Sequence, residues 1–157
     1  MKDLLMIRHS KTEMMADSDM KRELTEQGMA DAVTLGKMFH ESGIKADIFV
    51  SSPAVRAKKT AKLIARGLNY PENSIISEEL LYYAHPEEIV SFVRHFDKNI
   101  DSLIIVGHNP IILEAINILG NKRVARLKTS HAVKFQFDTD SWEDISPDNC
   151  KHMVKIF

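Results

Sequence analysis

Short apolar runs alternate along this chain with longer stretches of helical periodicity. Continuous apolar runs at residues 4–7, 48–50 and 103–106 are typical of central strands that are covered on both faces. Apolar residues recur at helical spacing over residues 26–42, and a second helical pattern follows Pro53. This alternation predicts an α/β fold, a three-layer α/β/α sandwich with a mostly parallel central sheet.

The pattern changes in the last part of the chain. Val133, Phe135 and Phe137 alternate with polar residues, which predicts a strand with one solvated face and hence an antiparallel edge. Residues 142–145 and 153–157 are predicted to form a closing antiparallel hairpin. The remaining predicted elements are a short strand at residues 74–77 and helices that start at Pro86 and Pro110.

Length and charge limit the class of protein. A chain of 157 residues without repeats or linkers is the size of one domain, so residues 1–157 are predicted to form a single domain. The 21 basic and 22 acidic side chains give a net charge of −1, which argues against a nucleic-acid partner. Apolar runs are too short for a membrane span, and the single cysteine, Cys150, excludes an internal disulfide. We therefore expect a cytoplasmic protein with no membrane partner.

Polar clusters follow the three strongest predicted strands. The first strand runs into Arg8-His9-Ser10, and the second into Ser51-Ser52-Pro53, with Arg56 in the helix that follows. The third runs into Gly107-His108-Asn109-Pro110. Ligands of open α/β sheets bind at the carboxyl ends of strands. If the three strands are neighbours, two arginines and two histidines converge on one place.

These residue types together indicate a phosphate site. The planar guanidinium groups of Arg8 and Arg56 match phosphate oxygens, and the helix expected to begin at Ser52 has free N–H groups that favour an anion. A neutral histidine can attack phosphorus and form a covalent phosphoenzyme. The sequence contains no histidine pair with metal-ligand spacing and no evident carboxylate cage for magnesium, so neither a metal nor another cofactor is expected.

Four segments resemble the motifs of the histidine phosphatase superfamily, which also contains the phosphoglycerate mutases. Residues 5–13, Leu-Met-Ile-Arg-His-Ser-Lys-Thr-Glu, are similar to its Arg-His-Gly signature. Residues 21–28 resemble its Arg-Pro-Leu-Thr-x-x-Gly, residues 51–61 its Ser-Pro-x-x-Arg-Ala-x-x-Thr-Ala, and residues 106–110 its Gly-His-Asn-Pro. The matches follow the family's order. The absence of a large insertion between the third and fourth motifs looks most like the SixA-type phosphohistidine phosphatase branch.

The resemblance implies a role for each matching residue. His9 would be the nucleophile, and Arg8, Arg56 and His108 would hold the phosphoryl group. Arg22 matches a further arginine that reaches the substrate. The implied activity is that of a metal-independent phosphatase, and the implied partner is a phosphorylated protein such as a phosphotransfer domain.

The sequence departs from the family pattern at two places. Ser10 replaces the usual glycine, which predicts a side chain in the pocket wall. Larger members carry a carboxylic acid after the third strand that protonates the leaving oxygen, whereas residues 80–86 contain no acid, and none of the nearby glutamates at 78, 79, 87 and 88 matches the pattern. An alkoxide needs such an acid more than an imidazole does. The absence of this carboxylic acid therefore favours phosphohistidine over an alkyl phosphate as substrate.

Other functions and roles stay open at this point. A phosphatase of small phosphomonoesters is the competing enzyme, and a phospho-ligand binding module without catalysis is the competing class; a mutase is disfavoured. Tyr82 and Tyr83 fit the pocket lining and core or rim packing equally well. The loop of residues 10–22, rich in methionines and acids, fits either a rim that shapes partner choice or a cover for apolar surface.

Overall fold

The structure is a computed structural model that describes residues 1–156. Its strands are β1 (Lys2–Arg8), β2 (Ile48–Ser51), β3 (Ile76–Ser77), β4 (Ser102–Gly107), β5 (Ala132–Phe137) and β6 (Cys150–Ile156). Its α-helices are α1 (Glu26–Glu41), α2 (Val55–Gly67), α3 (Leu80–Tyr83), α4 (Pro86–Arg94) and α5 (Ile111–Leu119).

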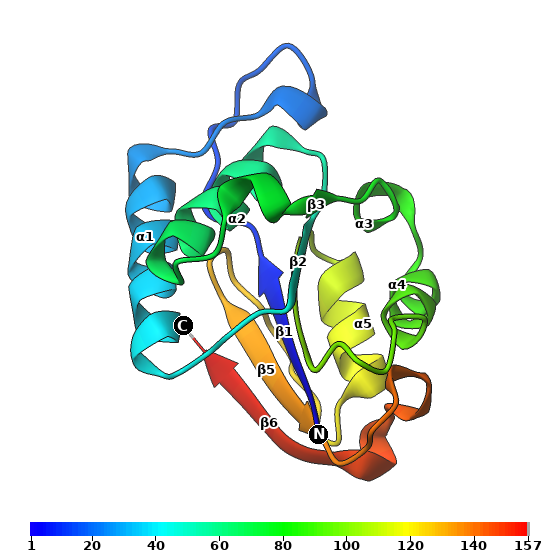
Figure 1. The fold of residues 1–157 in the computed structure, drawn as a ribbon. Coiled ribbons are helices and arrows are strands. Elements are labelled where there is room, and N and C mark those ends of the chain that lie inside the picture. Colours follow the sequence, from blue (N-terminus) through cyan, green and yellow to red (C-terminus); the bar gives the residue numbers. More distant parts are fainter. Residues whose placement is uncertain (157) are drawn as a thin grey trace.

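Over residues 1–156 the strands form a six-stranded sheet in the order β3-β2-β4-β1-β5-β6 (Figure 1). The pairs β3-β2, β2-β4 and β4-β1 are parallel, and β5 and β6 continue the sheet in antiparallel orientation. The predicted mostly parallel sheet with an antiparallel edge is therefore confirmed.

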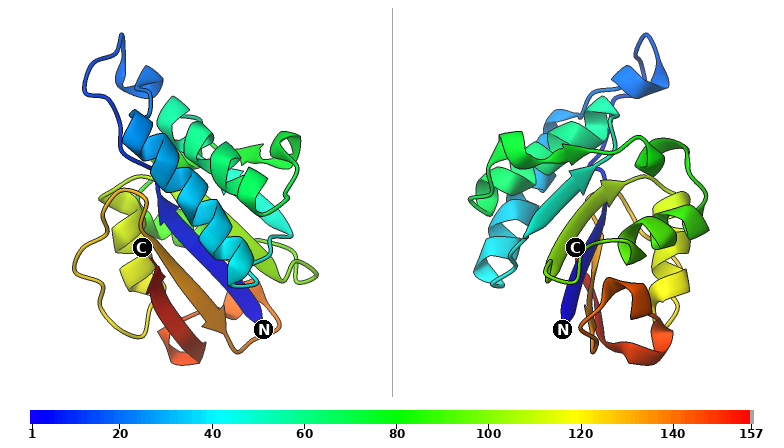
Figure 2. Two further views of the ribbon diagram at one scale, coloured as in Figure 1. Left: turned by 90° about the vertical axis from the view of Figure 1, so that its left-hand side faces the viewer. Right: turned by 45° about the vertical axis from the view of Figure 1, so that its right-hand side comes forward.

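Helices cover both faces of the sheet, which gives the predicted three layers (Figures 1 and 2). Helices α1 and α2 pack on one face, where Leu35 and Ile64 meet Phe49. Helices α4 and α5 pack on the other, where Val93 and Ile116 belong to the larger core. No helix within residues 1–156 is long and apolar enough to cross a membrane.

The strand register fixes where the strands end. Arg8 of β1 lies opposite Gly107 of β4, and Ser51 of β2 lies opposite Val106. All three strands are parallel, so the residues that follow them emerge at the same edge of the sheet. The polar clusters that follow β1 and β2 thus lie beside the cluster that follows β4, the strand between them.

The predicted terminal hairpin is wrong in its first half. Residues 142–144 form a 3₁₀ turn in which Trp142 is fully buried, and its indole N–H donates to the Ile100 carbonyl at 2.7 Å. Burial of this large ring draws the segment onto the core and away from the sheet. The strand that closes the sheet is β6, which pairs with β5. Phe157, the last residue of the predicted hairpin, lies outside the described residues.

Helix boundaries agree with the sequence except in the middle of the chain. The Thr25 hydroxyl caps α1 by accepting from the Gly28 N–H at 2.9 Å, as expected. Helix α2 begins at Val55, two residues after Pro53, rather than at Ser52. The short helix α3 was not predicted; the Glu78 carboxylate accepts from the Leu80 N–H at its start.

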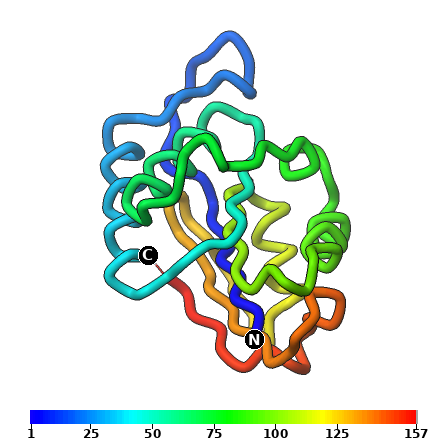
Figure 3. The backbone as a smooth tube through the Cα atoms, viewed as in Figure 1, coloured from blue at the N-terminus to red at the C-terminus, as the bar shows by residue number. Residues whose placement is uncertain are grey.

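Residues 10–25 form a loop that projects beyond the carboxyl end of β1 (blue in Figure 3). A bridge between Thr12 and Leu24 closes its base, and a 3₁₀ turn, η1, spans Asp19–Lys21. Met14 and Met15 in the loop expose 83% and 88% of their surface. Met14 and Met15 therefore do not cover apolar surface, whereas Met20 is half-buried.

Close packing of α1 against α2 depends on two glycines. A methyl carbon placed on Gly67 would lie 2.5 Å from the carbonyl carbon of Gly36, so the helices must separate to admit it. We expect Gly67→Ala to lower the free energy of unfolding by about 1–3 kcal/mol, because overpacking outweighs the gain in helix propensity. Urea denaturation measures this loss. Lys62→Ala, an exposed change in the same helix, is the control, and equal stability of both variants would contradict the packing argument.

Candidate active site

Backbone hydrogen bonds join the three strand ends into one site. The His9 N–H donates to the Gly107 carbonyl at 3.1 Å, and the Ser52 N–H donates to the Val106 carbonyl at 3.1 Å. The rings of His9 and His108 consequently lie with centroids 5.2 Å apart. The structure thus brings together the residues that the sequence placed on separate strands.

His9 is buried and held as a neutral imidazole. The ring exposes little surface, and its Nδ1 lies 2.8 Å from the Ser10 carbonyl oxygen. Because a carbonyl can only accept, Nδ1 carries the proton and Nε2 keeps its lone pair. Burial lowers the pKa of His9 to about 4, and the positive charges of Arg56 and Arg8 add to this effect. Neutral His9 is therefore a competent nucleophile at Nε2.

His108 adjoins the hydroxyl of Ser52. Its Nε2 lies 2.7 Å from Ser52 Oγ, which also accepts from the Ala54 N–H at 3.2 Å. Burial, followed by the charges of His9 and Arg56, lowers the pKa of His108 to about 3. A neutral His108 that receives the hydroxyl proton at Nε2 carries its own proton on Nδ1. In that tautomer Ser52 orients His108 and Nδ1–H becomes a donor.

Unsatisfied polar atoms collect at this site. Among residues 1–156, four buried side-chain atoms have no hydrogen-bond partner: Arg8 Nε, Arg56 Nε, His108 Nδ1 and Asn109 Oδ1. An unpaired buried polar group costs about 1–3 kcal/mol, so such atoms are rare and need an explanation. Three of the four are nitrogens that can donate to an oxyanion. The charge and the open donors match a phosphoryl group.

Each arginine is anchored through its terminal nitrogens. Arg8 Nη1 donates to the Leu127 carbonyl at 3.1 Å. Arg56, which is nearly buried, donates from Nη1 to the Asp19 carbonyl at 2.7 Å and from Nη2 to Asp19 Oδ2 at 3.0 Å. These contacts take both terminal nitrogens of Arg56 and one of Arg8, and they leave the Nε–H of each arginine unpaired.

Arg22 lies in the loop near this group and not at the strand ends. Its Nε donates to the Glu13 carbonyl, and its terminal nitrogens contact Thr12 Oγ1 and Asp19 Oδ1. The charge of Arg22 contributes, after those of Arg56 and Arg8, to the low pKa of His9. Arg22 therefore borders the site while its donors bind the loop itself.

Asp19 and Tyr82 belong to the site; the sequence indicated no role for Asp19 and left the role of Tyr82 open. The Tyr82 hydroxyl donates to Asp19 Oδ2, and the Tyr82 ring lies edge-on to His108 with centroids 5.4 Å apart. The Arg56 guanidinium carbon lies 6.0 Å from the centre of the same ring. The signal in the sequence that could have identified Asp19 as a site residue was its position three residues before Arg22. For Tyr82, these contacts favour the pocket lining or its rim over core packing.

Ser10 supports the site from behind. Its side chain is fully buried, and its hydroxyl accepts from the Ser130 hydroxyl at 2.6 Å. The Ser10 N–H donates to Thr60 Oγ1, which in turn donates to the Arg56 carbonyl at 2.7 Å. Thr60 and Ser130 thus fix the end of β1 against α2 and the turn before β5; neither role was predicted.

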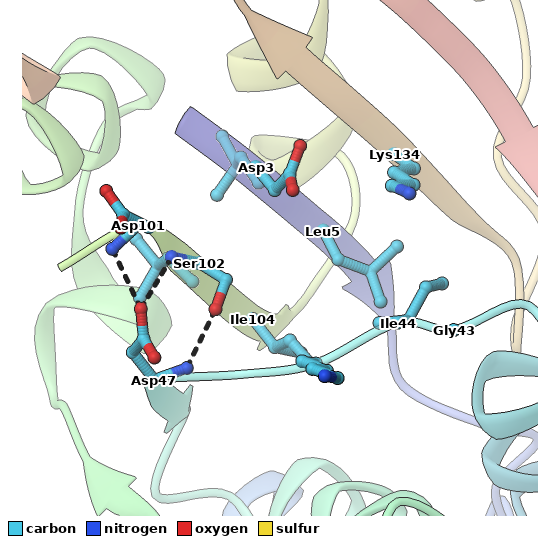
Figure 4. A pocket seen from close by; sticks show the side chains of 12 residues that line it. Asp3, Leu5, Gly43, Ile44, Asp47, Asp101, Ser102, Ile104 and Lys134 are labelled. Atoms are coloured by element: carbon cyan, nitrogen blue, oxygen red, sulfur yellow. Dashed lines mark hydrogen bonds between the residues drawn. The ribbon is translucent and has the colours of Figure 1, made fainter. Parts of the chain in front are cut away.

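A separate cavity of about 290 Å³ lies at the opposite end of the sheet (Figure 4). The Asp47 carboxylate beside it accepts from the N–H groups of Asp101 and Ser102, at 2.8 and 3.1 Å. Asp3 and Ser102 begin the register of β1 with β4, whereas His9 and His108 follow its end. This cavity is therefore remote from the candidate site formed by His9 and His108.

Comparisons with known proteins point to one family. The profile of the histidine phosphatase superfamily (branch 1) matches residues 4–81. The phosphohistidine phosphatase SixA homolog of Haemophilus influenzae is 30% identical over 129 residues, which cover 77% of this chain and 79% of that protein.

Solved structures share the fold at lower identity. A protein histidine phosphatase SixA complexed with tungstate superposes with a TM-score of 0.81 at 16% identity, covering 99% of this chain and 94% of that one. The alpha-ribazole phosphatase of Shigella flexneri superposes with a TM-score of 0.65 at 14% identity, covering 88% and 92%. These likenesses establish the phosphoglycerate mutase-like fold.

The state of His9 is open to direct measurement. We expect ¹⁵N NMR of the free protein at pH 7 to show a neutral His9 ring protonated at Nδ1, with a titration midpoint near pH 4. The resonance that disappears in His9→Ala gives the assignment. A midpoint near the ordinary 6.5, or a ring protonated at Nε2, would contradict the geometry described above.

Proposed function

Because the chain belongs to the histidine phosphatase superfamily and, like its SixA homologue, is a phosphatase, we propose that it acts through a phosphohistidine on His9 and dephosphorylates phosphohistidine on a protein. The observation that carries the proposal is the neutral His9, whose Nδ1–H binds the Ser10 carbonyl at 2.8 Å. The SixA homologue from Haemophilus influenzae, named for phosphohistidine, supports the choice of substrate.

In the first step, the lone pair of His9 Nε2 forms a bond to phosphorus. The bond from phosphorus to the substrate nitrogen breaks, and its electron pair returns to the substrate imidazole. Charge spreads over the phosphoryl oxygens during this transfer. The unpaired Nε–H groups of Arg8 and Arg56 and the Nδ1–H of His108 are the donors that stabilise it.

In the second step, water attacks the phosphoryl group and the bond to His9 Nε2 breaks. His9 keeps its Nδ1 proton on the Ser10 carbonyl, so it leaves as neutral imidazole and not as an imidazolate. One proton of the water stays on the inorganic phosphate, and the other passes to a phosphate oxygen or to solvent. The site returns to its starting state.

The charges around the site support an N-linked substrate. A hydrogen bond from Tyr82 and the charge of Arg56 lower the pKa of Asp19 to about 2, so this carboxylate is ionised at neutral pH and has no proton to give. The Glu78 and Glu88 carboxylates bind the backbone N–H groups of Leu80 and His85 at helix starts. An imidazole needs an acid less than an alkoxide does.

Metal independence is part of the proposal. The donors that face the phosphoryl group are cationic or neutral nitrogens, which supply the charge stabilisation that a metal provides in other phosphatases. These donors belong to Arg8, Arg56 and His108, and His9 is the nucleophile. Arg22 and Ser52 act through their neighbours, Arg22 at the rim and Ser52 on His108.

Trapping the phosphoenzyme tests this mechanism. With a phosphohistidine peptide, the wild-type protein is expected to form an acid-labile, base-stable phosphoprotein that maps to His9. Loss of a nucleophile costs about 10³–10⁶-fold in turnover, so His9→Ala should be inactive on this peptide. His40→Ala, an exposed change on α1, serves as the control, and a chelator should leave the rate unchanged. Turnover by His9→Ala or loss of activity with chelator would refute the proposal.

A further inference from the structure

Asp19 is a carboxylate that contacts residues of the proposed phosphoryl site. It contacts Arg56 at 3.0 Å, Arg22 at 3.3 Å and the hydroxyl of Tyr82, whose ring lies against His108. The carboxylate reaches the site from the projecting loop, above the carboxyl ends of β1 and β4. Asp19 takes no part in the two steps proposed above for phosphoryl transfer through His9.

The two oxygens of Asp19 differ in their engagement. Oδ2 accepts from both Arg56 Nη2 and the Tyr82 hydroxyl, which fills its acceptor positions. Oδ1 has one long contact, 3.3 Å from Arg22 Nη1, and the side chain as a whole exposes 52% of its surface. Asp19 is therefore held in place on one side and still has acceptor capacity on the other.

The leaving imidazole of a phosphohistidine needs an acceptor for the proton on its distal nitrogen. When the phosphorus–nitrogen bond breaks, the imidazole departs as a neutral molecule only if its distal nitrogen already carries a proton. Without that proton it must depart as an imidazolate, a far poorer leaving group. A carboxylate that accepts from the distal N–H favours the protonated, reactive form.

We propose that Asp19 accepts a hydrogen bond from the distal N–H of the substrate's phosphorylated imidazole, and so selects N-linked phosphoryl groups over alkyl phosphates. The inference rests on the proposed function of the site. The bond from phosphorus to His9 Nε2 forms as the substrate P–N bond breaks. The electron pair stays on the substrate nitrogen, and the distal proton remains on the imidazole, bound to Asp19.

Electrostatics of the site support this role. Burial and neighbouring positive groups lower the pKa of His108, and the negative charge of Asp19 partly offsets them, which places Asp19 within electrostatic reach of the ring. Asp19 itself is held ionised by its bond from Tyr82 and by Arg56. An ionised carboxylate attracts a cationic imidazole and repels a developing alkoxide. Asp19 therefore favours the departure of an imidazole and disfavours the departure of an alkoxide.

The test compares two substrates in Asp19→Asn, which keeps the shape of the side chain and removes its charge. One substrate is a phosphohistidine peptide, and the other is 4-nitrophenyl phosphate, whose leaving group has no N–H. A hydrogen bond to a charged group is worth about 1.5–3 kcal/mol, so kcat/KM for the peptide should fall about 10- to 100-fold more than for the aryl phosphate. Asp17→Asn, an equal charge change at an exposed position of the same loop, should leave the ratio unaltered.

The pH profile separates this role from simple positioning of Arg56. In the enzyme–substrate complex the Asp19 charge stabilises the protonated imidazole, so Asp19→Asn should move the alkaline limb of kcat for the peptide to lower pH. Equal losses on both substrates with an unmoved limb would overturn the inference and make Asp19 a support for Arg56 alone. A wild-type protein that hydrolyses the aryl phosphate through His9 but not the peptide would instead refute the proposed substrate class.

Discussion

The parallel register of β1 with β4 is the constraint on which the site depends. It sets Arg8 opposite Gly107, so that the next residue of each strand is a histidine and the two rings lie 5.2 Å apart. A one-residue slip would turn one of these side chains to the other face of the sheet. Buried apolar residues on both faces of each strand oppose such a slip, since any shift would expose them or force helices apart. The apolar core therefore sets the positions of His9 and His108 without being part of the site itself.

Within this frame the site keeps a group of unpaired donors. The buried Nε atoms of Arg8 and Arg56 have no partner among the described residues, and both arginines are anchored at their outer ends. The stability of the surrounding fold offsets the cost of leaving these donors unpaired, and binding of the proposed phosphoryl group would give them partners. The same positive charges and the same burial keep His9 neutral. One arrangement thus prepares both the anion site and the proposed nucleophile.

Much of this could be predicted from the sequence because it follows from local pattern. Apolar runs define the central strands, and their polar ends identify Arg8, His9, Arg56 and His108. The contacts of Asp19 could not be predicted, because they depend on how the loop of residues 10–25 places η1 against Arg56 and Tyr82, which no periodicity encodes. The hairpin error has a similar origin, since burial of Trp142 in the core overrides the local strand pattern. Sequence reasoning thus succeeded where regular elements set positions and failed where loop packing does.

The most direct test of the account is a crystal structure of the protein with orthovanadate, which adopts the five-coordinate geometry of the phosphoryl transition state. The account predicts vanadium bonded to His9 Nε2, with its equatorial oxygens accepting from Nε of Arg8 and Arg56 and with His9 Nδ1 still on the Ser10 carbonyl. Vanadate bonded to another residue, or held away from His9 with both Nε groups still unpaired, would contradict it.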